Sequence, residues 1–202
     1  MKVWQCIVCK YIHKGESLPE KCPVCNVPAI KFKEMDAASI PPKPEAKKPL
    51  EKEIIEKGSI FEKIKLLMTK HHAHPISAHI PNGILPLILL LWAAAWILEY
   101  DLLSKAAFIN LIFVLVSLPF VIFTGRLEWQ KKYNASFSGV FKIKIAVTIV
   151  ITILSIISFA WYIINPDILS SSNALMFILI NIVIVIAVGI AGYIGGKLVF
   201  KD

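Results

Sequence analysis

Long apolar stretches dominate the second half of the chain and predict four membrane-spanning helices. They cover about residues 76–98, 103–125, 139–164 and 173–196, and short polar connections separate them. A helix needs about 20 predominantly apolar residues to cross the hydrocarbon core of a bilayer, and each stretch is that long. The predicted fold class is therefore an all-α four-helix transmembrane bundle over residues 72–202, in contact with the lipid bilayer, behind a small N-terminal domain.

The residues before the first span change pattern twice. Residues 36–49 contain four prolines and no aromatic residue, which is typical of a semi-rigid linker. Residues 50–71 follow a helical pattern, and we expect an amphipathic helix that lies in the membrane interface. A helix packed against the N-terminal domain, residues 1–35, is the alternative interpretation. The apolar positions recur at one-, three- and four-residue steps: Ile60, Phe61, Ile64, Leu67 and Met68.

Composition and charge also favour a membrane protein. The chain is 56% apolar, compared with about 45–50% in ordinary globular domains. The net charge of +8 comes from Lys and Arg residues that concentrate in the first seventy residues and in particular connections. Basic residues favour the cytoplasmic side, and the connections at 99–101 and 165–167 carry none. We therefore expect a multi-pass cell-membrane protein with both termini in the cytoplasm and no nucleic-acid partner.

The cysteines of the chain form two Cys-x-x-Cys pairs, Cys6 with Cys9 and Cys22 with Cys25. Two such pairs supply four thiolates, which suits tetrahedral iron or zinc. Closely spaced cysteines in the cytoplasm indicate metal ligation rather than disulfides. Because so small a domain buries little core, a bound metal would supply much of its folding free energy. Since the chain opens directly on this motif, we expect no cleaved signal peptide.

The N-terminal segment resembles the rubredoxin-like module that ends rubrerythrins. The resemblance covers about 35 residues and rests on Trp4 before the first pair, Tyr11 after it, the sequence Cys22-Pro-Val-Cys25, and the late Phe32. It implies that the four cysteines hold a mononuclear iron that carries single electrons. A structural zinc ribbon is the competing interpretation.

The chain departs from this module at two positions. Rubredoxin-like modules usually have Gly after each cysteine pair, where the backbone needs a positive φ. Here Lys10 and Asn26 occupy those places. Asn tolerates that conformation, and Lys does so less readily.

Histidines cluster at the start of the first predicted span. Four of the five lie within nine residues: His71, His72, His74 and His79. Pro75 suits the first turn of a helix. Side chains on a helix lean toward its N-terminus, so we expect His79 to lean back toward His74 and His72.

Arg126 and Glu128 end the second span on the same predicted side of the membrane. Ionisable groups at membrane depth indicate function. The candidate second site is a metal or haem centre formed by His72, His74, His79 and Glu128, and Arg126 and His71 are candidates to support an acceptor there. Two other interpretations stay open: histidines that meet lipid headgroups and water, or a quinone or proton site without metal.

Two motifs of the membrane region resemble a four-helix membrane family of bacteria and archaea. The segment His74-Pro-Ile-Ser-Ala-His79-Ile-Pro-Asn-Gly83 is similar to its hallmark His-Pro-x-x-x-His-x-Pro-x-Gly, and Thr124-Gly-Arg-Leu-Glu-Trp129 is similar to a second signature. The resemblance covers about residues 70–165 and implies haem binding or electron transfer. Many members have another histidine near the third span, where this chain has Phe141 and Lys142. No histidine lies beyond residue 79. Two axial histidines from different helices of one protomer are therefore excluded, and a haem would need a homo-oligomer or a second ligand of another type.

Polar and small residues also form stripes within the predicted spans. Residues seven apart share a helix face. Helix–helix contact is the simpler interpretation of such a face, and a polar interior around a cofactor or quinone is the alternative. The positions are Asn110, Ser117 and Thr124 in the second span, Thr148, Ser155 and Tyr162 in the third, and Asn181, Gly189, Gly192 and Gly196 in the fourth.

Together these patterns predict a membrane-bound electron-transfer protein. We expect a cytoplasmic donor, a reductase or a ferredoxin-like protein, to supply single electrons to the rubredoxin-type iron. The acceptor would be a metal, a haem or a quinone at the cytoplasmic face of the membrane domain. For a membrane oxidoreductase, the candidate substrates are quinone, oxygen, superoxide and peroxide. The alternative is a non-catalytic membrane anchor for a rubredoxin-like or zinc-ribbon module.

Overall fold

The long helices of this protein are shared between two structural units. The computed structural model describes residues 2–8, 11–23, 26–35, 58–133, 135, 137 and 139–200. The first unit contains residues 1–74, 123–141 and 197–202, and the second contains residues 75–122 and 142–196. Each unit is described by itself below.

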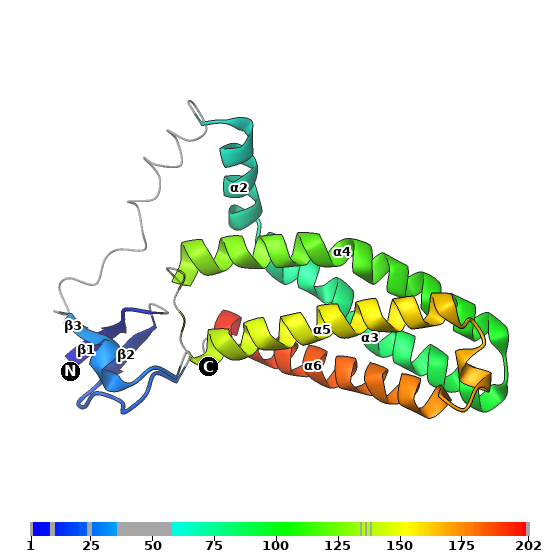
Figure 1. Ribbon diagram of the computed structural model, residues 1–202. Coiled ribbons are helices and arrows are strands. Elements are labelled where there is room, and N and C mark those ends of the chain that lie inside the picture. Colours follow the sequence, from blue (N-terminus) through cyan, green and yellow to red (C-terminus); the bar gives the residue numbers. More distant parts are fainter. Residues whose placement is uncertain are drawn as a thin grey trace. The chain divides into compact units, whose positions relative to one another are not determined.

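A three-stranded antiparallel sheet forms the N-terminal part of the first unit. Its strands are β1 (Lys2–Cys6), β2 (Ile12–Gly15) and β3 (Phe32–Met35), in the order β2-β1-β3, and a short 3-10 helix, η1 (Ala29–Lys31), leads into β3 (Figure 1). The central strand is the most buried, and its residues Val3, Trp4 and Cys6 are all buried. The sheet forms the small N-terminal domain that the sequence predicts ahead of the helical bundle.

Helix α2 (Ile60–Lys70) begins at a capping box. The Ser59 hydroxyl accepts a hydrogen bond from the Glu62 backbone N–H at 3.3 Å, and the Ser59 N–H donates to the Glu62 carboxylate at 2.9 Å. These bonds satisfy backbone donors that a helix start otherwise leaves unpaired. Helix α2 lies within the predicted helical range of residues 50–71, and residues 36–57 lie outside the described part of the chain. The exposed apolar residues of α2 are Ile60, Phe61, Ile64 and Leu67.

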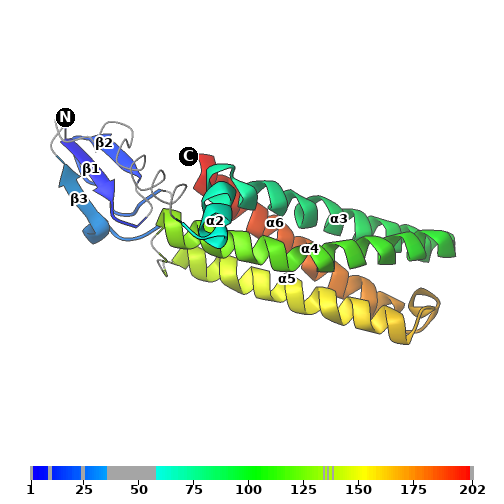
Figure 2. The same cartoon turned by 90° about the horizontal axis from the view of Figure 1, so that it is seen from above.

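Four helices follow, and all are long and apolar enough to cross a membrane. They are α3 (Ala73–Leu98), α4 (Asp101–Tyr133), α5 (Gly139–Ile164) and α6 (Ala174–Phe200). In the second unit their segments pack side by side, and consecutive helices run in opposite directions (Figures 1 and 2). The predicted four-helix bundle is therefore confirmed. Helix α4 continues eight residues past the predicted end of its span, from 125 to 133. The apolar stretch marks only the membrane segment, and the helix continues through the polar residues that follow it.

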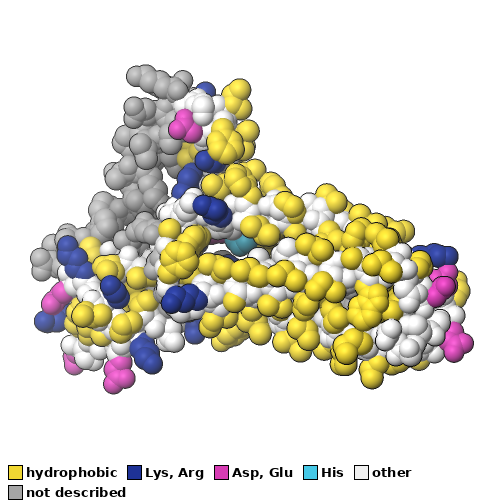
Figure 3. All heavy atoms as spheres, in the orientation of Figure 1, with side chains coloured by type: hydrophobic (Ala, Val, Ile, Leu, Met, Phe, Trp, Pro, Cys, Tyr) yellow, Lys and Arg dark blue, Asp and Glu magenta, His cyan; other side chains and the backbone are white. Residues whose placement is uncertain are grey.

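The core of the second unit is rich in aromatic rings. The Trp92 ring contacts the Phe177 ring edge-on at 4.7 Å between centroids, and Phe108 stacks on Tyr162 at 4.5 Å. Outside this core, large apolar side chains cover the surface of the helices (Figure 3). Such a surface suits lipid as its solvent, because contiguous apolar surface of this extent is rare on water-soluble monomers.

Polar side chains inside the second unit pair across helices. The Ser104 hydroxyl donates to the Tyr162 hydroxyl at 3.0 Å, joining α4 to α5. Asn181 of α6 donates to the Ser158 hydroxyl of α5 at 2.9 Å. Tyr162 and Asn181 belong to the polar stripes of the sequence, and their burial confirms the interpretation of helix–helix contact.

Candidate functional site

Two of the four predicted metal ligands lie in the described part of the N-terminal domain. Cys6 ends strand β1, and Cys22 follows the bridge between Lys21 and Pro28. Both side chains are fully buried, with exposures of 0%. The Cys6 N–H donates to the Tyr11 carbonyl and the Cys22 N–H donates to the Val27 carbonyl, both at 2.8 Å. Each cysteine is therefore fixed where its chain turns back on itself.

Asn26 shows the backbone conformation that the sequence predicts after the second cysteine pair. Its φ is 58°, in the left-handed region. Its N–H donates to the Cys22 carbonyl at 2.8 Å, which closes a turn after Cys22. Cys9, Cys25 and Lys10 lie outside the described residues.

The described half of this site fits a thiolate-bound metal. A thiolate ligand must be shielded from water and held on a rigid backbone, and buried Cys6 and Cys22 on tight turns meet both conditions. His13 does not belong to this centre, because its ring stacks on Trp4 with centroids 5.8 Å apart and its Nε2 meets the Ser17 carbonyl at 3.2 Å.

The histidine cluster divides into one packed and three exposed side chains. The His74 ring is half-buried at the start of α3, and its Nδ1 lies 3.5 Å from the Thr124 hydroxyl of α4. A Cβ on Gly125 would stand 2.9 Å from His74 Cε1, so the ring lies directly on the backbone of α4. The two sequence motifs of the membrane region thus meet at these three residues.

His71, His72 and His79 are exposed. His71 caps the C-terminus of α2, and His72 has a φ of 53°. A left-handed residue after a helix end reverses the chain direction, which is the usual role of Gly or Asn. His72 therefore has a structural role at the turn between α2 and α3. Among the described residues, no group of three or more His, Cys, Asp or Glu side chains lies in a geometry that could hold a metal ion.

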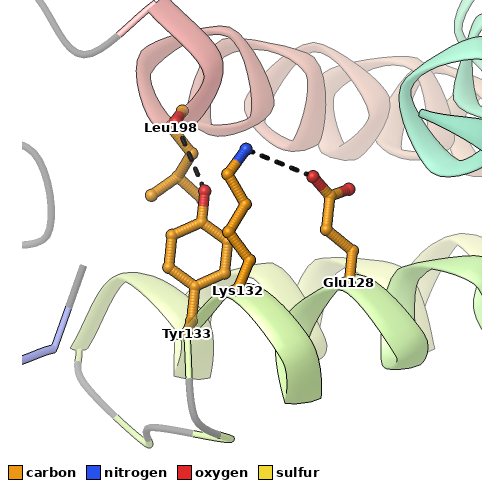
Figure 4. Close-up of polar contacts among 4 residues, drawn as sticks. All are labelled: Glu128, Lys132, Tyr133 and Leu198. Carbon is orange, nitrogen blue, oxygen red and sulfur yellow. Dashed lines mark hydrogen bonds and ion pairs between the residues drawn. The ribbon is translucent and has the colours of Figure 1, made fainter. Parts of the chain in front are cut away.

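Glu128 lies beside a small pocket between α2 and α4. The pocket is lined by Met68 and Thr69 of α2 and by Thr124, Leu127 and Glu128 of α4. The Glu128 side chain is only 17% exposed, and its carboxylate pairs with Lys132 at 3.4 Å (Figure 4). Arg126 is exposed. The predicted histidine and Glu128 site did not include Met68 or Thr69, which line this pocket. The helical spacing of α2 did place Met68 on the apolar face of the helix.

Neighbouring contacts brace this end of α4. The Tyr133 hydroxyl donates to the Leu198 carbonyl of α6 at 3.3 Å (Figure 4). Tyr133 and Phe141 rings pack with centroids 4.9 Å apart. The bracing joins the ends of α4, α5 and α6 within the first unit.

The sheet, its buried cysteine turns and the four apolar helices define a membrane protein with a rubredoxin-like metal domain. Residues 4–33 match the model of the rubredoxin-like domain of rubrerythrin. Residues 70–202, about two thirds of the chain, match the family described as predicted membrane protein (DUF2231), and the chain belongs to that family. The predicted fusion of the two parts is confirmed.

A curated relative supports the first of these matches. Reverse rubrerythrin-1 of Clostridium acetobutylicum is 54% identical over 35 residues, which cover 17% of this chain and 19% of that protein. This chain therefore spans about a fifth of the relative's length in the match. No solved structure shows significant similarity to the chain.

Proposed function

We propose that this protein carries single electrons between a cytoplasmic donor and an acceptor at the cytoplasmic end of its membrane domain. The observation that carries the proposal is the fusion of a rubredoxin-like domain, with Cys6 and Cys22 buried on tight turns, to four membrane-crossing helices. An iron bound by Cys6, Cys9, Cys22 and Cys25 would supply one-electron chemistry without proton transfer. The expected donor is a reductase or a ferredoxin-like protein.

The acceptor end of the proposal rests on His74. This imidazole, held between Thr124 and the Gly125 backbone, is the packed member of the histidine cluster. Glu128 is a mostly buried carboxylate on the same stretch of α4. An acceptor that needs a single imidazole from each protomer, such as a quinone or a haem shared by two protomers, suits this arrangement better than a metal held by three side chains of one protomer.

The metal is tested on detergent-purified protein from an iron-replete host. We expect one iron per chain and a ferric-thiolate absorption band that bleaches on reduction. Cys9→Ser should remove the band and unfold the small domain, because metal binding is coupled to its folding. A colourless protein with one zinc per chain would contradict electron transfer and support the zinc-ribbon interpretation.

The acceptor is tested by the rate at which reduced protein regains its colour with a soluble quinone or with oxygen. We expect His74→Ala to slow recovery at least about tenfold, on the scale of a lost supporting residue, while the ferric spectrum stays intact. His71→Ala is the matched control, because His71 is exposed at the end of α2. A Soret band that disappears in His79→Ala would identify haem and support His79 as a ligand.

A non-catalytic anchor is the second candidate. Its support is that His71, His72 and His79 are exposed, as a membrane domain without a second centre allows. Equal recovery rates in the wild type, His74→Ala and His79→Ala, with one iron and no haem, would establish the anchor.

A further inference from the structure

Two polar atoms in the core of the second unit have no hydrogen-bond partner among the described residues. They are Nε1 of Trp92 on α3 and Oγ of Ser155 on α5. Both side chains are completely buried. In the hydrocarbon region no bulk water reaches such atoms, and an unsatisfied polar group there costs several kcal/mol. Buried orphan groups in native proteins therefore indicate a bound molecule or a special role.

Ser155 differs from the other hydroxyls of its helix. Thr148 donates to the Lys144 carbonyl and Thr152 donates to the Thr148 carbonyl, each at 2.8 Å. This local bond is the ordinary solution for a hydroxyl in a membrane helix. Ser155 makes no such bond, and its side chain is fully buried rather than turned toward lipid.

The orphan atoms lie in a polar layer of the bundle. Trp92 packs against Tyr162 and Phe177, with ring centroids 6.1 Å and 4.7 Å away. Ser155 precedes Tyr162 by seven residues, so both lie on one side of α5, about 10 Å apart along its axis. The hydrogen-bonded pair Ser158 and Asn181 lies between these levels. The layer sits about 9 to 14 Å from the Leu98 and Ile164 ends of α3 and α5, given a rise of about 1.5 Å per residue.

The hydrogen-bonding capacity of the two atoms indicates which kind of molecule could bind to them. The indole N–H of Trp92 can only donate a hydrogen bond, whereas the Ser155 hydroxyl donates and accepts. A cation is excluded because it would face the positive end of the N–H dipole. An anion would carry an unpaired charge into the membrane at high cost. A small neutral molecule that accepts and donates meets every requirement, and buried water typically makes about three hydrogen bonds to such groups.

We propose that the bundle contains a buried water site shared by Trp92 and Ser155. A short chain of water molecules accepts from the Trp92 N–H, bonds to the Ser155 hydroxyl, and borders the Ser158–Asn181 pair. The site gives the half of the bundle near Leu98 and Ile164 a hydrated interior, which the electron-transfer proposal does not require.

The site is tested by NMR on ¹⁵N-tryptophan-labelled full-length protein in lipid nanodiscs. The chain has five tryptophans, so Trp92→Phe assigns the indole resonance by its loss. We expect a cross-peak between the Trp92 indole proton and water, and we expect Ser155→Ala to weaken it and shift the resonance. Thr152→Val is the matched control, because the Thr152 hydroxyl is already bonded within α5, and it should leave the cross-peak unchanged. Absence of the cross-peak in the wild type, or its persistence in Ser155→Ala, would overturn the proposal.

A stability measurement decides the same question independently. If the Ser155 hydroxyl were truly unsatisfied, its removal would relieve a desolvation cost and stabilise the bundle. If water satisfies it, Ser155→Ala breaks hydrogen bonds and lowers the SDS fraction at which the bundle unfolds. A rise in that fraction would contradict the water site even if the NMR variant could not be assigned.

Discussion

Two residues with unusual backbone surroundings organise the candidate sites. Asn26, which follows the second cysteine pair in the sequence, adopts a left-handed conformation, and Gly125 leaves room for the His74 ring. Neither residue supplies a ligand. Both set where a ligand-bearing residue lies, so substitutions there test the geometry of a site without removing its chemistry.

At Asn26 we predict opposite effects of two small substitutions. Asn26→Gly should stabilise the metal-loaded domain by about 0.5–1 kcal/mol, and Asn26→Ala should destabilise it by about 1 kcal/mol, because only Gly adopts positive φ without steric cost. The midpoint of thermal bleaching of the metal–thiolate band measures both. Equal midpoints for the two variants would mean that the turn relaxes out of the left-handed region.

At Gly125 we predict that an added methyl group displaces His74. Gly125→Ala places a Cβ 2.9 Å from the imidazole, and overpacking of this kind costs about 1–3 kcal/mol. Gly189→Ala is the matched control on α6, since nothing lies within 4 Å of its Cβ position; it should be neutral or stabilising by up to about 1 kcal/mol. Detergent-based unfolding and the imidazole NMR signals of His74 provide the measurements. The double variant Gly125→Ala with His74→Ala should recover the loss, and failure to recover it would show that the cost lies elsewhere.

At the scale of elements, the start of α2 depends on its capping box. Ser59→Ala removes the acceptor for the Glu62 N–H and should destabilise the first turn by about 1 kcal/mol. Hydrogen exchange of the backbone amides of residues 60–63 in the full-length protein should accelerate about fivefold, as that free energy implies. Thr69→Val is the control, because Thr69 bonds to the Lys65 carbonyl near the other end of α2. Unchanged exchange in Ser59→Ala would mean that tertiary contacts, such as the Phe61–Phe123 ring contact, hold the first turn.

At the scale of the whole molecule, charge predicts orientation in the membrane. The ends of α4, α5 and α6 near residues 126–144 and 197 carry Arg126, Lys131, Lys132, Lys142, Lys144 and Lys197. Lys and Arg favour the cytoplasmic side. Reporter fusions in the connections at 99–100 and 165–167 should therefore report the outside, and labels near Lys2 should be reached only after cell lysis. Labelling of Lys2-side positions in intact cells would refute this orientation.

Much of the architecture could be predicted from local signals. The length of each apolar stretch predicts a membrane helix, because in lipid the backbone N–H and C=O groups can only hydrogen-bond to each other. The spacing of the cysteines predicts a metal domain, and the rubredoxin-like resemblance implies a positive φ at Asn26, where the structure has a φ of 58°. The ends of helices were less predictable: α4 continues to Tyr133 because backbone hydrogen bonding extends beyond the apolar stretch.

The sequence by itself determined the two-part organisation and the membrane class, because these depend on composition and spacing. The turn after the second cysteine pair was implied by the resemblance to rubredoxin-like modules. Only the tertiary structure decided which histidine is packed, that Gly125 makes room for it, and that Nε1 of Trp92 and Oγ of Ser155 are buried with no hydrogen-bond partner among the described residues. Those outcomes depend on distances between helices. Periodicity assigns a residue to a face of its helix, but the rotation of each helix against its neighbours decides what that face meets.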